Sequence, residues 1–129
     1  MNIPAELLYT KSHEWARREG TEVVVGITEH AQQELRDVVF AEVPAVGKVV
    51  SQGEAVAVVE SVKAAFDIYA PVSGRITRVN AALSKTPQLI NQDCYGTGWL
   101  FAVNPSTTDE FASLLSPSDY SKQLQAEAH

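Results

Sequence analysis

The sequence has a single cysteine and no long hydrophobic run. Cys94 has no second cysteine to pair with, so the chain forms no internal disulfide and needs no oxidising compartment. No apolar stretch approaches the roughly 18 residues that a membrane-spanning helix requires. The N-terminus lacks the basic region and apolar core of a signal peptide and the arginine-rich character of an organelle transit segment. We therefore expect a cytoplasmic chain, complete as given, with no membrane partner.

Basic residues are scarce relative to acidic ones. The 129 residues include 10 Lys and Arg against 16 Asp and Glu, which gives a formal net charge of −6. Nucleic-acid binding relies on Lys and Arg to neutralise phosphates, and no basic stripe is present, so we exclude nucleic acid as a partner. The charge balance fits a soluble protein that meets other proteins, and we expect the chain to be a monomer.

The sequence also lacks the common catalytic and metal-binding motifs. No HExxH or CxxC spacing occurs, and His13 and His30 could bind a metal with Glu14 only if the fold brought them together. Ser61, His30 and Asp67 could be assembled into a Ser/His/Asp set, but no G-x-S-x-G nucleophile elbow is present. The seven glycines are scattered singly at expected turns, so no phosphate-binding loop is predicted. These absences predict a protein that is not an enzyme and has no metal site.

Strand-forming residues dominate the first hundred positions. Runs of Val, Ile and aromatic residues between turn residues predict strands at 13–17, 22–27, 38–43, 46–50, 55–60, 65–69, 75–79 and 99–103. The first two strands flank Glu19-Gly20 and predict an N-terminal hairpin. Thr28 is placed to cap a short helix near 29–35. One helical turn is expected after Pro4, and residues 80–92 are predicted to be a long loop with a helical turn.

Two short helices are predicted near the C-terminus, within about 107–126. Thr107 to Glu110 fits a capping box, and Ser116-Pro117 fits a cap followed by proline at the first helical position. Residues 125–129 are expected to fray. We expect residues 1–129 to form a single domain of the mainly β class, with its core within about 9–104.

The strands at 55–60 and 65–69 meet at a short segment that contains Lys63. The order strand, glycine turn, strand, tip, strand, Pro/Gly turn, strand is approximately two-fold symmetric about residues 62–64. In a flattened barrel or sandwich, such symmetry lets the two halves pair while the central hairpin projects at one end. Most lysines at exposed turns are only solubilising charges, but a lysine at this tip is also accessible to an acylating enzyme. A rigid domain with a modified lysine free to swing suits a carrier of tethered intermediates.

Segments in order along almost the whole chain then point to one family: Tyr9–Trp15, Val25–Gln32, Val38–Pro44, Val59–Ala64, Asp67–Gly74, Leu89–Asn91 and Tyr95–Leu100. They resemble the H-protein family of the glycine cleavage system. The resemblance implies a lipoyl-type barrel-sandwich hybrid fold. It also implies that lipoic acid is joined by an amide bond to Lys63.

The resemblance further implies partners and a carrier mechanism. A pyridoxal-phosphate-dependent glycine decarboxylase (P-protein) would pass the aminomethyl group to the lipoyl disulfide. An aminomethyltransferase (T-protein) would release ammonia and give the one-carbon unit to tetrahydrofolate, and a dihydrolipoyl dehydrogenase (L-protein) would reoxidise the dithiol. A lipoate-attaching enzyme would load Lys63. The chain would be the shuttle among them in glycine catabolism and one-carbon metabolism.

In this family the loaded arm folds back into a cleft on the carrier. By resemblance, Glu14, His30, Ser61 and Asp67 fall at positions that could line such a cleft, and carboxylates would hold the aminomethyl cation. The alternative for each is a plain surface polar residue. Phe66 departs from the small or polar residue that similar proteins often carry, and its ring could shield the arm or widen an apolar docking patch.

Three alternatives differ in the cofactor or in the role. Biotin carriers also place a lysine at a hairpin tip, but methionine flanks that lysine, whereas Met1 is the only methionine here. Lipoyl domains of 2-oxoacid dehydrogenases are shorter and typically have the sequence Asp-Lys-Ala at the tip. In this chain Val62 precedes Lys63. An H-protein-like lipoate donor or interaction module outside glycine turnover stays open.

Overall fold

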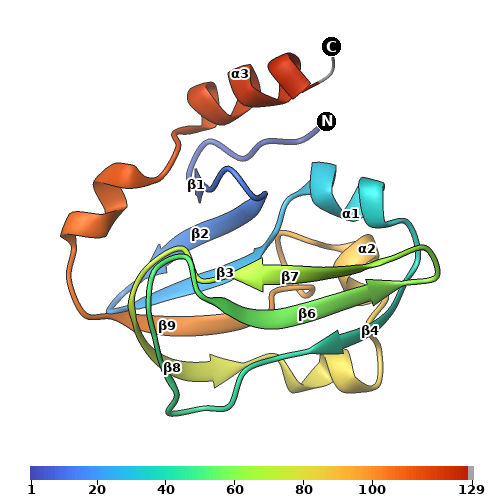
Figure 1. Ribbon diagram of the computed structural model, residues 1–129, viewed down its shortest axis with the longest axis horizontal. Helices are drawn as coiled ribbons and strands as arrows, with labels where there is room; N and C mark the ends of the chain where they lie inside the picture. The colour runs from blue at the N-terminus through green and yellow to red at the C-terminus, as the bar shows by residue number, and fades with distance from the viewer. Residues whose placement is uncertain (128–129) are drawn as a thin grey trace.

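The computed structural model describes residues 1–127, and its strands form two antiparallel sheets (Figure 1). The six-stranded sheet has the order β1-β2-β3-β9-β8-β5, and the three-stranded sheet has the order β4-β6-β7. The strands are β1 Leu8–Tyr9, β2 Glu14–Glu19, β3 Glu22–Ile27, β4 Val38–Glu42, β5 Val49–Val50, β6 Ala55–Ser61, β7 Ala65–Tyr69, β8 Gly74–Val79 and β9 Phe101–Pro105. The mainly β fold predicted from the sequence is confirmed, including the N-terminal hairpin of β2 and β3.

The main core contains side chains from both sheets. Val23 and Val25 of β3 belong to this core, while Val24 belongs to a second cluster, as the alternation of side chains along a strand requires. The three-stranded sheet contributes Val59 of β6 and Ile68 of β7. The six-stranded sheet is therefore buried on both faces around β3.

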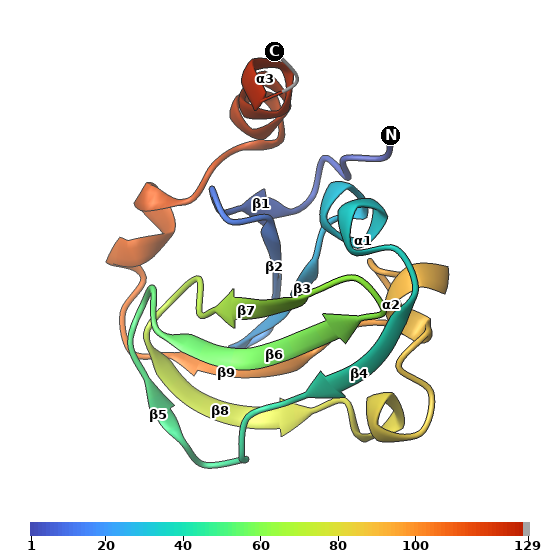
Figure 2. The same cartoon turned by 45° about the vertical axis from the view of Figure 1, so that its right-hand side comes forward.

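The second cluster lies where the last helix, α3 (Pro117–Glu127), packs against the N-terminal strands. Tyr120 of α3 stacks on Tyr9 of β1, with ring centroids 4.6 Å apart and planes 7° from parallel. Figures 1 and 2 both show α3 beside the N-terminal segment at one end of the molecule. Ser116 accepts a hydrogen bond from the Asp119 N–H, as expected for the cap of this helix.

The first helix, α1 (Glu29–Leu35), begins as predicted. The Thr28 hydroxyl accepts a hydrogen bond from the N–H of Ala31 at 3.2 Å. The helical turn expected after Pro4 is absent, because residues 5–6 form only a turn before the chain enters β1. The predicted loop at 80–92 holds two short helices instead of one, η1 (Ala81–Ser84) and α2 (Leu89–Gln92). No helix among the described residues is long and apolar enough to cross a membrane.

The first C-terminal helix differs from the prediction. It is a 3-10 helix, η2 (Asp109–Ser113), and Thr107 does accept a hydrogen bond from the Asp109 N–H. Glu110 does not complete a capping box, because its carboxylate accepts hydrogen bonds from the N–H and hydroxyl of Ser73, at 2.6 and 2.7 Å. Residues 125–127, expected to fray, belong to α3, and the last two residues of that prediction lie outside the described chain.

The bounds of β4, β6 and β8 differ from the predicted strands by one residue at one end, and three other strands differ more. The strand expected at 46–50 is reduced to β5, because residues 45–48 form a turn in which Gly47 has φ of +93°. The strand expected at 13–17 begins one residue later, since His13 adopts a φ of +75° that a strand cannot contain. β9 begins at Phe101 and runs on to Pro105.

The β6–β7 hairpin is the part of the fold that positions the lysine. Glu60 pairs with Ala65 beside the turn in the three-stranded sheet, while Val50 pairs with Gly74 in the six-stranded sheet. The strand pairs are therefore nested about residues 62–64, as the sequence order predicted. Figure 1 shows the hairpin extending to one side of the molecule, above β4 and below α1.

Candidate functional site

Lys63 is exposed in the turn that joins β6 to β7. The N–H of Ser61 donates a hydrogen bond to the carbonyl of Ala64 at 2.8 Å. The Ser61 hydroxyl accepts hydrogen bonds from the N–H groups of Lys63 and Ala64, both at 3.1 Å. The turn backbone is thus fixed from inside. Within residues 1–127, the ammonium of Lys63 makes no ion pair or side-chain hydrogen bond.

The turn is braced from one side by the start of β4. Val38 pairs with Ser61, and the N–H of Val62 donates to the carbonyl of Asp37 at 3.4 Å. Another lysine, Lys48, pairs instead with Glu54 at 3.5 Å. The fold therefore presents Lys63 on a backbone held by two neighbouring strands, with its side chain left in solvent.

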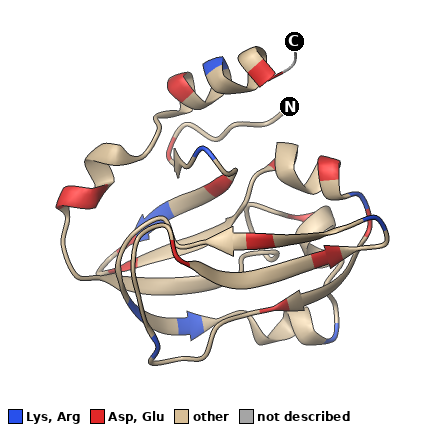
Figure 3. Cartoon of the chain, in the orientation of Figure 1, with Lys and Arg blue, Asp and Glu red and all other residues tan. Residues whose placement is uncertain are grey.

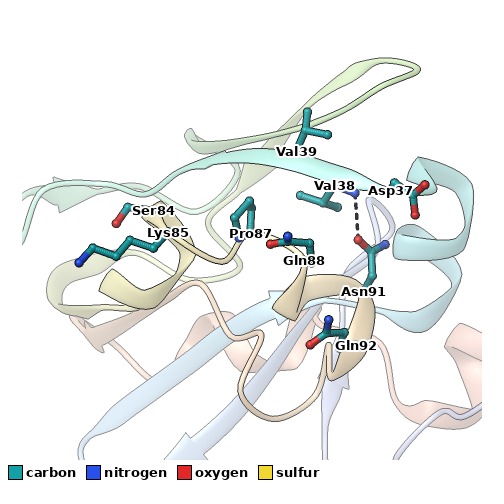
Figure 4. Close-up of a pocket in the computed structure, with 9 residues that line it drawn as sticks. All are labelled: Asp37, Val38, Val39, Ser84, Lys85, Pro87, Gln88, Asn91 and Gln92. Atoms are coloured by element: carbon teal, nitrogen blue, oxygen red, sulfur yellow. Dashed lines mark hydrogen bonds between the residues drawn. The ribbon is translucent and has the colours of Figure 1, made fainter.

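A broad, open hollow of about 640 Å³ lies between β4 and the η1–α2 segment (Figure 4). Its lining consists of Asp37, Val38, Val39, Ser84, Lys85, Pro87, Gln88, Asn91 and Gln92. Figure 4 shows the hydrogen bond that joins its two sides, donated by the Val38 N–H to the Asn91 side-chain oxygen at 2.9 Å. No histidine, cysteine or pair of carboxylates is among the residues that line this hollow.

A smaller cleft, of about 60 Å³, lies between β7 and α1. Phe66, Asp67 and Ile68 of β7 form one wall, and the lining is completed by Ser12, His13, Ile27, Ala31, Glu34 and Leu35. The first of these wall residues follows Lys63 by three positions. The cleft combines apolar side chains with the two carboxylates of Asp67 and Glu34. It suits a slender ligand with an apolar stem and a cationic end.

Asp67 is the one of the four predicted cleft residues that lines this cleft. Glu14 is instead only 1% exposed and lies beneath the loop before β2. Its carboxylate accepts hydrogen bonds from the hydroxyls of Thr10 and Ser12, at 2.5 and 2.6 Å, and from the Tyr69 N–H at 3.2 Å. Because Ser12 lines the cleft, Glu14 acts on the cleft by holding that loop against β7.

The other two predicted residues have different neighbours. The hydroxyl of Ser61 accepts hydrogen bonds from backbone N–H groups of the hairpin turn and does not line the cleft. His30 lies on α1 with its ring centroid 4.6 Å from that of His13, and it does not line the cleft. Sequence reasoning missed Ser12 and Glu34. The position of Glu34, one helical turn after His30, was a usable signal, whereas nothing local marks Ser12.

Acidic residues lie on all three strands of the sheet that carries the lysine turn. Figure 3 shows acidic positions on β4, β6 and β7, the three strands of the smaller sheet. They are Glu42, Glu60 and Asp67, and Glu42 and Asp67 are exposed. A partner that reaches the tip therefore meets a negatively charged face.

Cys94 is excluded as a nucleophile by its surroundings. The residue is 7% exposed. Burial, and secondarily the charge of Glu29, raises the pKa of its thiol to about 12. Because the thiolate is the reactive form of cysteine, Cys94 is a packing residue.

Comparisons with known proteins agree over the whole chain. The family described as "Glycine cleavage H-protein" matches residues 7–127. The glycine cleavage system H protein of Thermus thermophilus is 56% identical over 128 residues, covering 99% of this chain and 100% of the relative. That of Rubrobacter xylanophilus is 52% identical over 125 residues, covering 97% of both chains.

A crystal structure of a glycine cleavage system H protein from Mycobacterium marinum superposes with a TM-score of 0.86. Its sequence is 41% identical, and the match covers 95% of this chain and 98% of that one. The likeness of sequence and of fold therefore extends over nearly the full length. The chain belongs to the glycine cleavage H-protein family, the non-catalytic lipoyl carriers of the glycine cleavage system.

Proposed function

We propose that Lys63 is the residue to which lipoic acid is attached by an amide bond. The observation that carries this proposal is an exposed lysine, with no ion pair to residues 1–127, on a hairpin turn whose backbone is fixed by Ser61. A lipoate-attaching enzyme needs access to the amine and a defined backbone to recognise, and this turn offers both. When attached, the lipoyl group supplies a disulfide that accepts the aminomethyl group of glycine and becomes reduced.

The cleft between β7 and α1 is the place where the loaded arm would rest. An arm on Lys63 can fold back along β7, because Phe66, Asp67 and Ile68 follow the turn and form one wall. The carboxylates of Asp67 and Glu34 would hold the cationic amine, and the ring of Phe66, which is 45% exposed, would cover the stem. Glu14 and His30 take part in this proposal only through the loop that carries Ser12 and His13.

The proposed partners follow from membership of the glycine cleavage system. The carrier would receive the aminomethyl group at glycine decarboxylase, deliver it to the aminomethyltransferase and be reoxidised by dihydrolipoyl dehydrogenase. The acidic face of β4, β6 and β7 would be the surface that these enzymes meet next to the arm. We propose that the chain works as a single domain, as a monomer and in the cytoplasm.

Reconstitution tests this proposal. The chain is prepared with and without lipoate and mixed with glycine, a glycine decarboxylase and labelled bicarbonate, and incorporation of label into glycine is followed. Lipoylated protein should support exchange at a rate at least about 100-fold above the unlipoylated chain, because the acceptor disulfide is present only in the former. Equal rates would contradict the carrier role. Lipoylation without any exchange would favour a lipoate donor outside glycine turnover.

A further inference from the structure

Three side chains that could bind a metal ion converge at the C-terminal end of α3. His13 comes from the loop before β2, His30 from the first turn of α1 and Glu127 from the end of α3. One ligand atom from each lies within 4.8 Å of the other two. We propose that His13, His30 and Glu127 bind a divalent transition-metal ion of the zinc class.

The spacing of two of these ligands already suits a small tetrahedral ion. The Nε2 atom of His13 and the Oε1 atom of Glu127 are 3.2 Å apart. Two ligands at about 2.0–2.1 Å from a tetrahedral ion are separated by roughly 3.3 Å. The ligand atom of His30 lies within 4.8 Å of the other two and would complete the set. Two imidazoles with one carboxylate are a common ligand combination for zinc with an open fourth position.

His13 is held in the orientation that a ligand requires. Its Nδ1 atom is 2.8 Å from the hydroxyl of Tyr120, and that hydroxyl is 2.7 Å from the hydroxyl of Thr28. If Nδ1–H donates to Tyr120, the lone pair of Nε2 faces Glu127. Metal-binding histidines are typically fixed in this way by a hydrogen bond to the other ring nitrogen.

His30 supplies an independent observation. Its Nε2 atom is the one buried side-chain nitrogen or oxygen, in the part of the chain that the structure describes, that has no hydrogen-bond partner. The carboxylate of Glu34 is 3.0 Å away, which is close enough for an ion pair, but its direction does not make a hydrogen bond. A buried polar atom left without a partner is costly, and an ion at the centre of the three ligands would use this lone pair.

Charge and access are both favourable for a cation. Glu127 and the neighbouring Glu34 place two carboxylates beside the two imidazoles, and the chain as a whole carries −6. The side chains of His13, His30 and Glu127 are 16%, 20% and 41% exposed, so the cluster lies near the surface and is most open at Glu127. Imidazole with carboxylate favours Zn²⁺, Ni²⁺, Co²⁺ and Cu²⁺ over Mg²⁺ and Ca²⁺.

A bound ion would join three segments that are far apart in the sequence. It would tie the end of α3 to α1 and to the loop that holds His13, which also lines the cleft beside β7. The expected effect is a firmer cleft wall and a more stable α3. This inference stands without the proposed role of Lys63, because it rests on His13, His30 and Glu127 alone and not on the lysine or its arm.

Titration calorimetry of the full-length chain with Zn²⁺ alone tests the site, and the visible spectrum with Co²⁺ reports the coordination geometry. One ion should bind per chain. Glu127→Gln and His13→Asn should each weaken binding by at least about tenfold, as loss of even an outer-shell partner does. Asparagine is chosen because it tolerates the positive φ at position 13.

Two controls make the result specific. Asp119→Asn removes an exposed carboxylate at the other end of α3 and should change Kd by less than about twofold. His129, which lies outside the described residues, is replaced by glutamine in a second control that should also bind normally. Absence of saturable binding would overturn the proposal. So would one-to-one binding that survives both Glu127→Gln and His13→Asn, or that is lost only with His129→Gln.

Discussion

The hydroxyl of Ser61 accepts a hydrogen bond from the backbone N–H of Lys63 at 3.1 Å. A second bond from the N–H of Ala64 has the same length. A lysine that must be recognised by several enzymes is therefore set on a turn that its own neighbour keeps in one conformation. This arrangement separates the two properties that a carrier needs, a fixed backbone and a free side chain.

Ser61→Ala removes this internal brace. We expect unfolding in urea to show a loss of about 1 kcal/mol, the usual contribution of a hydrogen bond, and the rate of enzymatic lipoylation to fall several-fold because the turn no longer holds one shape. Ser84→Ala is the matched control. The hydroxyl of Ser84 donates a hydrogen bond to the backbone carbonyl of Ala81, at 2.9 Å, and lies outside the hairpin turn. Equal lipoylation rates in the two variants would show that the brace does not serve recognition.

Asp67→Asn tests the proposed resting place of the arm. Loss of the carboxylate should let the aminomethyl-loaded arm leave the cleft more readily, so the aminomethyl group should be lost to water about two- to fivefold faster, as expected for a partly exposed charge pair. The loss is followed by ammonia release from loaded protein. Glu60→Gln on β6 removes a carboxylate of the same hairpin that does not line the cleft. The idea fails if both variants behave like the unchanged protein.

Glu14 should matter for stability. Glu14→Ala leaves the Tyr69 N–H and two hydroxyls without their shared acceptor, so we expect a loss of about 2–3 kcal/mol in the free energy of unfolding. Glu14→Gln should cost about half as much, because its amide oxygen still accepts and the hydroxyls can rotate. The exposed Glu42→Ala should change stability by less than about 0.5 kcal/mol. Equal losses in the alanine variants would refute this role.

The buried thiol of Cys94 predicts a specific pH dependence. Its pKa is about 12 in the folded chain, against about 8.5 when unfolded, so the folded state holds the proton more tightly. The stability from this group is complete below about pH 8.5 and is lost as pH rises toward about 12.

Cys94→Ser removes this contribution, together with the charge coupling of Cys94 to Tyr9 and Tyr95, because serine does not titrate. The stability advantage of the unchanged chain should shrink by about 1–2 kcal/mol between about pH 8 and pH 10.5, less than the full shift gives because some water reaches the thiol. Urea unfolding at both pH values measures the difference. A difference that stays constant with pH would contradict the predicted thiol pKa.

Local sequence signals were sufficient for most of the fold. The run of β-branched residues in Val23–Ile27, the cap at Thr28 and the short segment around Lys63 each predicted an element that the structure contains. They work because strand, cap and turn preferences act within a few residues. The capping box at Thr107 failed because a contact with distant Ser73 takes the Glu110 carboxylate.

The candidate site was less accessible to sequence reasoning. The turn lysine was evident, and Asp67 followed from family resemblance. The sequence suggested His13 and His30 as a metal pair only on condition that the fold brought them together, and with Glu14. Glu127 could not be foreseen as the third group, because it reaches the histidines only through the packing of α3 on β1. Such contacts depend on the assembled core. The role of Lys63 and the treatment of residues 1–129 as one domain stay predictions.

Intact-mass and peptide mass analysis of protein made with lipoate and the attaching enzyme tests the central claim most directly. We predict one lipoyl adduct per chain, located on the peptide that contains Lys63, and none in Lys63→Arg, which should keep the melting temperature of the unchanged chain. An adduct that persists in Lys63→Arg on Lys48 or Lys85, or an unmodified Lys63 in protein that carries lipoate elsewhere, would contradict the account.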